Sequence, residues 1–142
     1  MRLQALALVA SLAGLGISLY LTVVHYSTIP LVCPANGVIS CEQVLSSRYG
    51  VIGGSAIPTS AAGIVWFAVS ALLAAGLIAR SEGLARLQLG WSALGLLTVL
   101  FLIYVEIVQL GAICTWCSAA HVLVLVIFLV ALTSRNGTRV RS

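Results

Sequence analysis

Four apolar segments of membrane-spanning length dominate this chain of 142 residues. They cover residues 3–24, 58–79, 87–110 and 112–133, which together hold 90 residues. A bilayer core requires about 20 apolar residues per helical crossing, so each segment is long enough to span a membrane. Only 7% of the residues are charged, against roughly 25% in soluble domains. We therefore expect a single domain, residues 1–142, that is an all-α integral membrane protein folded as a four-helix bundle.

The arginines are distributed unevenly among the connections. Six of the seven lie at the N-terminus, in the 80–86 connection or in the C-terminal tail: Arg2, Arg80, Arg86, Arg135, Arg139 and Arg141. Only Arg48 lies in the outer loop of residues 25–57. Because cytoplasmic loops carry an excess of Lys and Arg, we expect both termini in the cytoplasm and this loop outside it. The net charge of +4 then reflects topology, and nucleic-acid binding is excluded.

A cleaved signal peptide is the alternative for the first segment, because Met1 and Arg2 precede a long apolar run. The apolar core of a signal peptide holds about 7–15 residues, whereas this run holds 22. Cleavage would also place the arginine-rich tail on the outer side. We therefore expect the segment to be retained as the first membrane helix.

The outer loop contains a signal for the start of a helix. Ser40-Cys41-Glu42-Gln43 has the form of a capping box, in which the first side chain caps the helix and the fourth reaches back. The apolar residues that follow at helical spacing are Val44, Leu45 and Tyr49. We expect a short surface helix over residues 42–49 that ends at Gly50 and lies over the mouth of the bundle.

All four cysteines lie near the outer face of the expected bundle. Cys33 and Cys41 are in the outer loop, while Cys114 and Cys117 form a Cys-x-x-Cys motif at the outer start of the fourth segment. Two structural disulfides are one explanation, but a Cys-x-x-Cys bridge closes a very short loop and adds little stability. A structural zinc site is another, but Cys33 and Cys41 are spaced loosely for paired ligands. Dithiol–disulfide exchange explains the pattern best, because two pairs within reach can pass electrons along.

The cysteines and the loop segment after them form one extended pattern. It consists of Cys33-x7-Cys41, then Val44-Leu45-Ser46-Ser47-Arg48-Tyr49-Gly50, then Cys114-Thr115-Trp116-Cys117. This pattern resembles the vitamin K epoxide reductase (VKOR) family in cysteine order, spacing and membrane position, over nearly the whole chain. The DsbB family performs similar chemistry with four helices but places its Cys-x-x-Cys motif first, so the order argues against it.

The resemblance implies a path for electrons. The thiols of a thioredoxin-like (DsbA-like) protein would attack the loop disulfide at Cys33. Cys41 would then exchange with Cys114, and Cys117 would reduce a lipid quinone of the ubiquinone, menaquinone or vitamin K type, with no metal involved. Many bacterial relatives carry a fused thioredoxin-like domain, whereas this chain ends nine residues after its fourth segment. We therefore expect the redox partner to be a separate polypeptide.

Polar residues near the pairs are candidates for active-site support. Ser47 matches a loop Ser or Thr that the VKOR family places beside the active site. His121 shares one helical face with Cys114 and Cys117 (i, i+3, i+7), so we expect it to hydrogen-bond a quinone carbonyl or to deliver a proton. Bonding to a neighbouring helix is the alternative, and animal relatives have tyrosine at this position.

Three further residues have both a functional and a structural interpretation. Glu106 lies about five residues inside the third segment, where an acid is expected to act in proton exchange or to position a thiol. Pairing with a histidine such as His25 is the structural alternative. Thr59 and Ser60 lie at the right depth to contact a quinone, but such hydroxyls also commonly bond their own helix.

We expect an integral membrane oxidoreductase of the VKOR type that oxidises a thioredoxin-like partner, reduces a membrane quinone and supports disulfide formation outside the cytoplasm. Reduction of vitamin K epoxide itself is an alternative that uses the same cysteines. A small transporter, or a structural membrane protein with inert disulfides, is a different class of alternative. A transporter is expected to have repeat symmetry or helices broken near the midplane, and the sequence has neither.

Overall fold

The computed structural model describes residues 2–27, 29–34, 36–79 and 83–140, and for residues 135–140 the backbone only. Its helices are α1 (Arg2–Tyr26), α2 (Cys41–Leu45), α3 (Thr59–Ile78), α4 (Leu84–Tyr104), the π-helix η1 (Val105–Leu110) and α5 (Thr115–Val140). The described residues contain four spans that are long and apolar enough to cross a membrane: α1, α3, α4 with η1, and the Thr115–Ser134 part of α5. The expected all-α bundle of four membrane helices is confirmed, and the chain is a multi-pass membrane protein.

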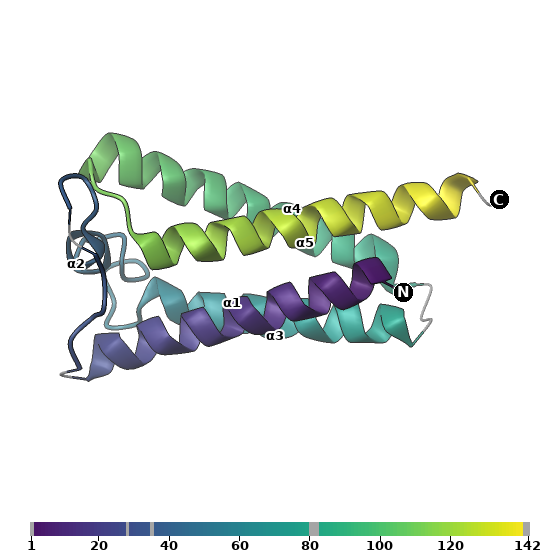
Figure 1. The fold of residues 1–142 in the computed structure, drawn as a ribbon, viewed down its shortest axis with the longest axis horizontal. Helices are drawn as coiled ribbons and strands as arrows, with labels where there is room; N and C mark the ends of the chain where they lie inside the picture. The colour runs from purple at the N-terminus through teal and green to yellow at the C-terminus, as the bar shows by residue number, and fades with distance from the viewer. Residues whose placement is uncertain (1, 28, 35, 80–82, 141–142) are drawn as a thin grey trace.

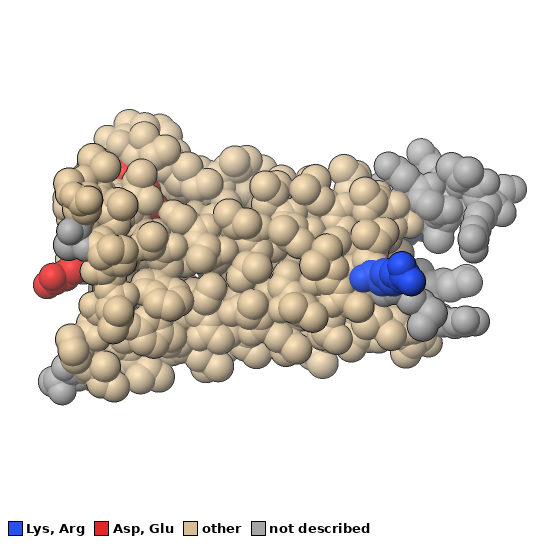
Figure 2. Space-filling model, in the orientation of Figure 1, with Lys and Arg blue, Asp and Glu red and all other residues tan. Residues whose placement is uncertain are grey.

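The four long helices form an up-and-down bundle (Figure 1). The two chain ends and the α3–α4 connection lie at one end of the bundle, which we call the terminal end. The loop that contains α2 lies at the opposite end of the bundle, as does the link between η1 and α5. We call this end the cysteine end. On the face shown in Figure 2, the coloured basic side chains lie at the terminal end and the acidic ones at the cysteine end, with an uncharged middle. This distribution is typical of a membrane-spanning bundle.

Close helix packing builds the middle of the bundle. Its core cluster consists of Ala10, Phe67, Val99, Val124 and Ile127. Gly14 lies against the ring of Phe67, and Gly95 lies against the indole of Trp66, so that a Cβ at either glycine would overlap the ring. Small residues let helix backbones approach closely in lipid, where no hydrophobic effect drives helices together. Large apolar side chains such as Leu72, 72% exposed, face outward where lipid covers them.

A polar cluster joins α1, α4 and α5 towards the terminal end. Gln4 and Gln88 donate to each other, with 3.2 Å from Gln4 Nε2 to Gln88 Oε1 and 3.1 Å in the opposite direction. Gln4 Nε2 also donates to Ser134 Oγ at 3.0 Å. Both glutamines are buried, so they satisfy each other where neither water nor lipid can. We call these three residues the glutamine clamp.

The fourth membrane helix begins at Thr115, three residues after the start of the apolar segment at residue 112. Gly111 closes η1 in the left-handed conformation, with φ 59°. Ile113 then forms a parallel bridge with Ile39, in which the Ile113 N–H donates to the Val38 carbonyl at 2.9 Å. This bridge holds the link extended, so the helix cannot form before it.

The outer-loop helix starts where the sequence predicted, although the capping box is incomplete. Ser40 caps α2, and its hydroxyl accepts the Gln43 N–H at 3.4 Å. The Ser40 N–H, which Gln43 would bond in a capping box, donates to the Ile113 carbonyl at 3.1 Å. The Gln43 side-chain amide donates instead to the Leu110 carbonyl at 3.2 Å. The loop helix is thereby tied to the end of η1.

The same helix is shorter than expected. It ends at Leu45, whereas the sequence suggested a helix continuing to Tyr49. The Ser47 hydroxyl donates to the Val44 carbonyl at 2.7 Å and accepts the Tyr49 N–H at 3.3 Å. Side-chain bonds of this kind give the backbone an alternative to the helix, which explains the early end.

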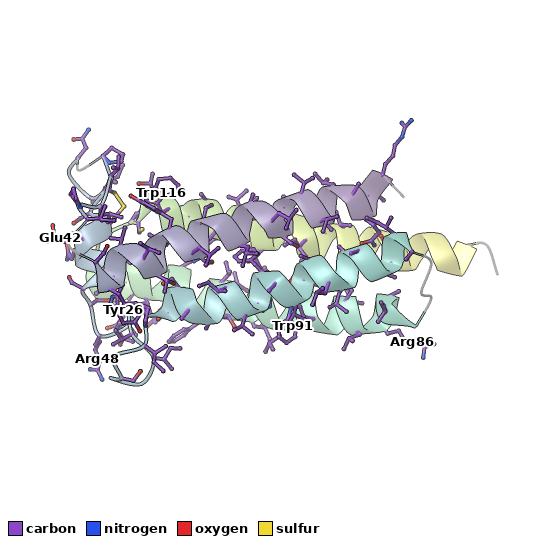
Figure 3. The ribbon with its side chains drawn as sticks, turned by 90° about the horizontal axis from the view of Figure 1, so that it is seen from below. Tyr26, Glu42, Arg48, Arg86, Trp91 and Trp116 are labelled. Carbon is purple, nitrogen blue, oxygen red and sulfur yellow. A yellow bond between two sulfur atoms is a disulfide. The ribbon has the colours of Figure 1, made fainter. Side chains whose placement is uncertain are left out.

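The arginine pattern is only partly visible in the structure. Arg86 lies at the terminal end, while Arg48 lies at the cysteine end (Figure 3). Arg80 and Arg141 lie outside the described residues, as do the side chains of Arg135 and Arg139. The orientation of the bundle across the membrane therefore stays a prediction.

Candidate active site

Backbone pairing brings the two cysteine pairs together at the cysteine end. The Ile39–Ile113 bridge aligns the chain just before Cys41 with the chain just before Cys114. One buried cluster contains Cys41, Val44, Ala112 and Cys114, with Cys33 and Cys117 packed against it. Cys41 is 1% exposed and Cys114 is fully buried. The four cysteines expected to form one site therefore lie together.

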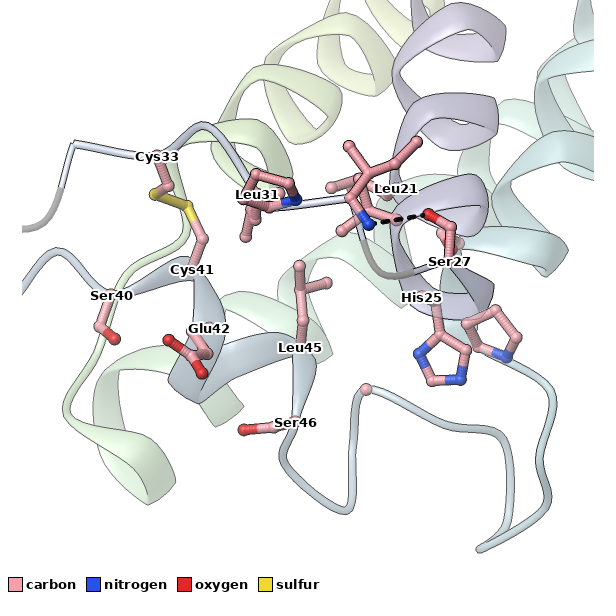
Figure 4. A pocket seen from close by; sticks show the side chains of 16 residues that line it. Leu21, His25, Ser27, Leu31, Cys33, Ser40, Cys41, Glu42, Leu45 and Ser46 are labelled. Atoms are coloured by element: carbon pink, nitrogen blue, oxygen red, sulfur yellow. Dashed lines mark hydrogen bonds between the residues drawn. A yellow bond between two sulfur atoms is a disulfide. The ribbon is translucent and has the colours of Figure 1, made fainter.

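The loop pair is oxidised. Cys33 and Cys41 form a disulfide, with their Cα atoms 6.2 Å apart. The disulfide lies on one side of an open groove of about 670 Å³, with His25 across from it (Figure 4). Cys33 is half-buried, whereas Cys41 is enclosed, so an incoming thiol reaches Cys33 more easily. The disulfide also removes two of the four thiolates that the zinc alternative would need.

Two aromatic side chains hold the chain just before Cys33. The Val32 N–H donates to the Tyr20 hydroxyl at 3.2 Å, and the Trp116 indole N–H donates to the Val32 carbonyl at 2.8 Å. The rings of Tyr20 and Trp116 are themselves in contact, with centroids 5.0 Å apart. Trp116 therefore fixes the outer loop to α5.

The second pair consists of Cys114, just before α5, and Cys117 in its first turn, and we call it the helical pair. Both of its cysteines carry free thiols. The Cys117 N–H donates to Cys114 Sγ at 3.3 Å. A hydrogen bond from the Cys117 thiol lowers the pKa of the Cys114 thiol and outweighs the opposing effect of burial. Because a thiol of lower pKa leaves faster in exchange, this contact favours Cys114 as the sulfur that is released from a mixed disulfide with the loop pair.

A second cavity, of about 330 Å³, opens beside the helical pair, between α1, α3, α4, η1, α5 and the outer loop. Six of the nine residues expected at the site line it: Ser47, Thr59, Ser60, Glu106, Cys117 and His121. The rest of the wall is mainly apolar and aromatic, as in sites for small apolar ligands. Cys33 and Cys41 line the groove instead, and Cys114 lies in the buried cluster between the two.

Three hydroxyl protons in this cavity, those of Ser47, Thr59 and Ser60, are already used within the protein. The Thr59 hydroxyl donates to the Tyr49 carbonyl at 2.8 Å. Thr22 donates to the Ser18 carbonyl at 2.8 Å, so the Ser60 hydroxyl, 2.8 Å from Thr22 Oγ1, is the donor of that pair. With the Ser47 proton likewise bonded, these groups can accept a hydrogen bond from a ligand but have no proton to offer to a carbonyl.

Glu106 reaches the cavity from η1. Glu106 is 6% exposed, and the backbone amide of Cys114 faces its carboxyl group. A π-helix carries one extra residue per turn and is often found at functional sites. His25 packs edge-to-face on Tyr26 and lines the groove, so the structural alternative, a pair between His25 and Glu106, is not formed among the described residues.

His121 lines the same cavity one turn below Cys117. Among the described residues its imidazole has no hydrogen-bond partner, so the structural alternative of a bond to a neighbouring helix is not realised there. A neutral imidazole carries one donor and one acceptor, so His121 can supply a donor that the Ser47, Thr59 and Ser60 hydroxyls cannot.

Several residues at the site had no clear sequence signal. Thr115 contacts both sulfurs of the loop disulfide, at 3.4 Å from Cys33 Sγ and 3.5 Å from Cys41 Sγ. Tyr20 and Val32 are joined only by the tertiary fold. Trp66 also lines the cavity, and nothing in the sequence around it indicated this. None of these contacts follows from spacing along one helix.

Comparison with protein families agrees with this geometry. A search among curated proteins gives no match. The sequence model of the Vitamin K epoxide reductase family matches residues 5–132, a range that includes all four cysteines and every residue of the cavity wall. Members of this family are oxidoreductases that generally use a quinone, which suits a buried dithiol beside an apolar cavity. The chain therefore belongs to the vitamin K epoxide reductase family.

Proposed function

We propose that this protein passes electrons from a thioredoxin-like dithiol protein, through the loop pair and then the helical pair, to a membrane quinone. The observation that carries the proposal is the shared burial of Cys41 and Cys114 in one cluster, with Cys117 in the wall of the apolar cavity. The loop pair thus adjoins the helical pair, and the helical pair adjoins the cavity. Sequential thiol–disulfide exchange requires this arrangement.

The first exchange takes place at the groove. A thiolate of the donor attacks Cys33 Sγ, forming a mixed disulfide and releasing Cys41 as a thiolate. The second donor thiol then attacks the mixed disulfide, so that the donor leaves oxidised and Cys33 becomes a thiolate. The half-buried position of Cys33 at the groove supports attack at that sulfur.

The second exchange transfers the same two electrons to the helical pair. Cys41 attacks Cys114 of an oxidised Cys114–Cys117 pair and releases Cys117 as a thiolate. Cys33 then attacks Cys41, which restores the Cys33–Cys41 disulfide and leaves Cys114 reduced. The product of this step has an oxidised loop pair and a reduced helical pair, which is the redox state of the structure described above.

The cavity is suited to a quinone head group. At about 330 Å³ it lies within the range of small-molecule sites, roughly 300–1,000 Å³. A bound quinone supplies the oxidising equivalents: it takes up two electrons and two protons while Cys114 and Cys117 form a disulfide. His121 offers a hydrogen-bond donor to a carbonyl, Thr59 and Ser60 offer acceptors, and Glu106 can hold a proton close to the dithiol.

We further propose that the cysteine end faces the extracytoplasmic side, with both termini in the cytoplasm. The placement of Arg86 at the terminal end supports this orientation. The cysteine end is then in a compartment where disulfides form and persist, so that the enzyme supports disulfide formation in exported proteins.

Quinone-dependent oxidation of a thioredoxin-like dithiol protein by the purified enzyme tests the proposal. Cys117→Ala should abolish quinone reduction from either a protein or a small dithiol. Cys33→Ala should abolish turnover with the protein donor but retain oxidation of a small dithiol that reaches Cys114 and Cys117 directly. Wild-type turnover in both variants would refute the electron path.

A further inference from the structure

The hydroxyl group of Thr115 lies against the loop disulfide. Its Oγ1 atom is 3.4 Å from Cys33 Sγ and 3.5 Å from Cys41 Sγ. Both sulfurs are joined in the disulfide and carry no proton, so the hydroxyl is the donor in these contacts. The residue therefore reaches from the helical motif to the sulfurs of the other pair.

This contact is produced by the same register that brings the pairs together. Thr115 is the first residue of α5 and directly follows the link paired with Ile39. The next residue of α5, Trp116, donates its indole N–H to the Val32 carbonyl and so holds the Cys33 side of the disulfide in place. Thr115 is thus fixed over the disulfide by contacts on both sides of it.

Cys41 is the sulfur that needs such a donor. It is 1% exposed, so water has little access to stabilise negative charge on it. Its neighbours in the buried cluster are Val44, Ala112 and Cys114. An unsolvated thiolate in apolar surroundings is strongly disfavoured unless a hydrogen bond stabilises it.

We propose that Thr115 is a catalytic residue of thiol exchange, whose hydroxyl donates a hydrogen bond to the Cys41 thiolate as it leaves. In this step an attacking thiolate forms a bond to Cys33 Sγ, the Cys33–Cys41 bond breaks, and the electron pair of that bond remains on Cys41 Sγ. The inference rests on the proposed function, in which the loop disulfide is the first electron acceptor.

The experiment measures reduction of the Cys33–Cys41 disulfide by dithiothreitol in the purified full-length protein, without oxygen or quinone. Thiols are trapped by alkylation and counted by mass. Thr115→Val removes the hydroxyl while keeping the shape, and should lower the second-order rate constant about tenfold, since hydrogen bonds to charged groups are the stronger ones. Thr115→Ser retains the hydroxyl and should stay within about twofold of wild type.

Thr133→Val provides the matched control, because the Thr133 hydroxyl bonds only carbonyls of its own helix, Leu129 and Val130. It should leave the rate unchanged. Thr115→Val should also raise the pH of half-maximal Cys41 alkylation in the reduced protein by about one unit, which corresponds to the tenfold change. A merely structural role would not move this value.

Two results would overturn the proposal. One is a wild-type rate in Thr115→Val; the other is equal slowing in Thr115→Val and Thr115→Ser, which would show that the hydroxyl is not the active group. Failure of the proposed function is detected separately, as the absence of quinone-dependent turnover in the wild-type protein, and it leaves the dithiothreitol comparison intact.

Discussion

The two ends of the bundle bury polar side chains in opposite ways. At the glutamine clamp, Gln4 and Gln88 use their amide groups on each other, and Gln4 also reaches Ser134. At the cysteine end, Glu106 and His121 face a cavity and bond no other side chain among the described residues. Polar groups inside a membrane protein are costly unless they are paired or line a cavity. The first arrangement fits a structural role, and the second leaves hydrogen-bonding capacity for a ligand.

This difference is visible only when burial and bonding are considered together. By burial alone, Gln88 at 2% exposed and Glu106 at 6% exposed look equivalent. Substitutions at the cysteine end should therefore change turnover more than stability, and substitutions at the glutamine clamp should do the reverse.

His121→Phe should give the largest difference between the two ends. Loss of the imidazole, which can both donate a hydrogen bond and deliver a proton, should lower quinone reduction by about 100-fold, the lower part of the range for general acid–base catalysis. Thiol exchange between the cysteine pairs, followed by alkylation without quinone, should remain unchanged. Near-wild-type quinone reduction would mean that the free imidazole has only a packing role.

Glu106→Gln should have a smaller effect of the same kind. The amide keeps the volume of the side chain but cannot take up a proton, so quinone reduction should fall about tenfold. Thermal unfolding should change little, because the carboxyl group bonds no other side chain among the described residues. A large loss of stability with unchanged turnover would place Glu106 with the structural residues.

Gln88→Leu should show the reverse behaviour. Removing one partner leaves the buried Gln4 amide with fewer bonds, at a cost of about 1 kcal/mol in the free energy of unfolding. Turnover per folded molecule should equal that of wild type. The double change Gln4→Leu with Gln88→Leu should recover part of the lost stability, since no amide then lacks its partner.

Trp116→Phe should have the smallest effect. It removes the indole N–H that bonds the Val32 carbonyl but keeps a ring beside Tyr20. Reduction of the loop disulfide by the protein donor should slow a few-fold as Cys33 becomes less well fixed, while quinone reduction from a small dithiol should be unchanged. Equal slowing of both reactions would show that the ring acts on the helical pair as well.

The features that the sequence predicted well are those with local causes. The four membrane helices follow from segment length and apolarity, and the start of α2 follows from Ser40. The clustering of the cysteines follows from topology, because all four lie at the same end of alternating helices. These predictions need no knowledge of which helix contacts which.

The features that the sequence did not predict depend on contacts between distant segments. The Ile39–Ile113 bridge delays the start of α5, and no local pattern marks either residue. Thr115 is important only because that bridge brings it to the loop disulfide. The hydroxyls of Thr59 and Ser60 were expected near a ligand, and only their partners reveal that they can accept but not donate.

The Ile39–Ile113 bridge has a kinetic consequence. Because it holds the outer loop and the link at adjacent positions, exchange between the two pairs is an intramolecular reaction of pre-arranged groups with a high effective molarity. Its rate should therefore be independent of protein concentration and insensitive to solvent viscosity. The encounters of the enzyme with the donor protein and with the quinone are then the only diffusive steps of the catalytic cycle.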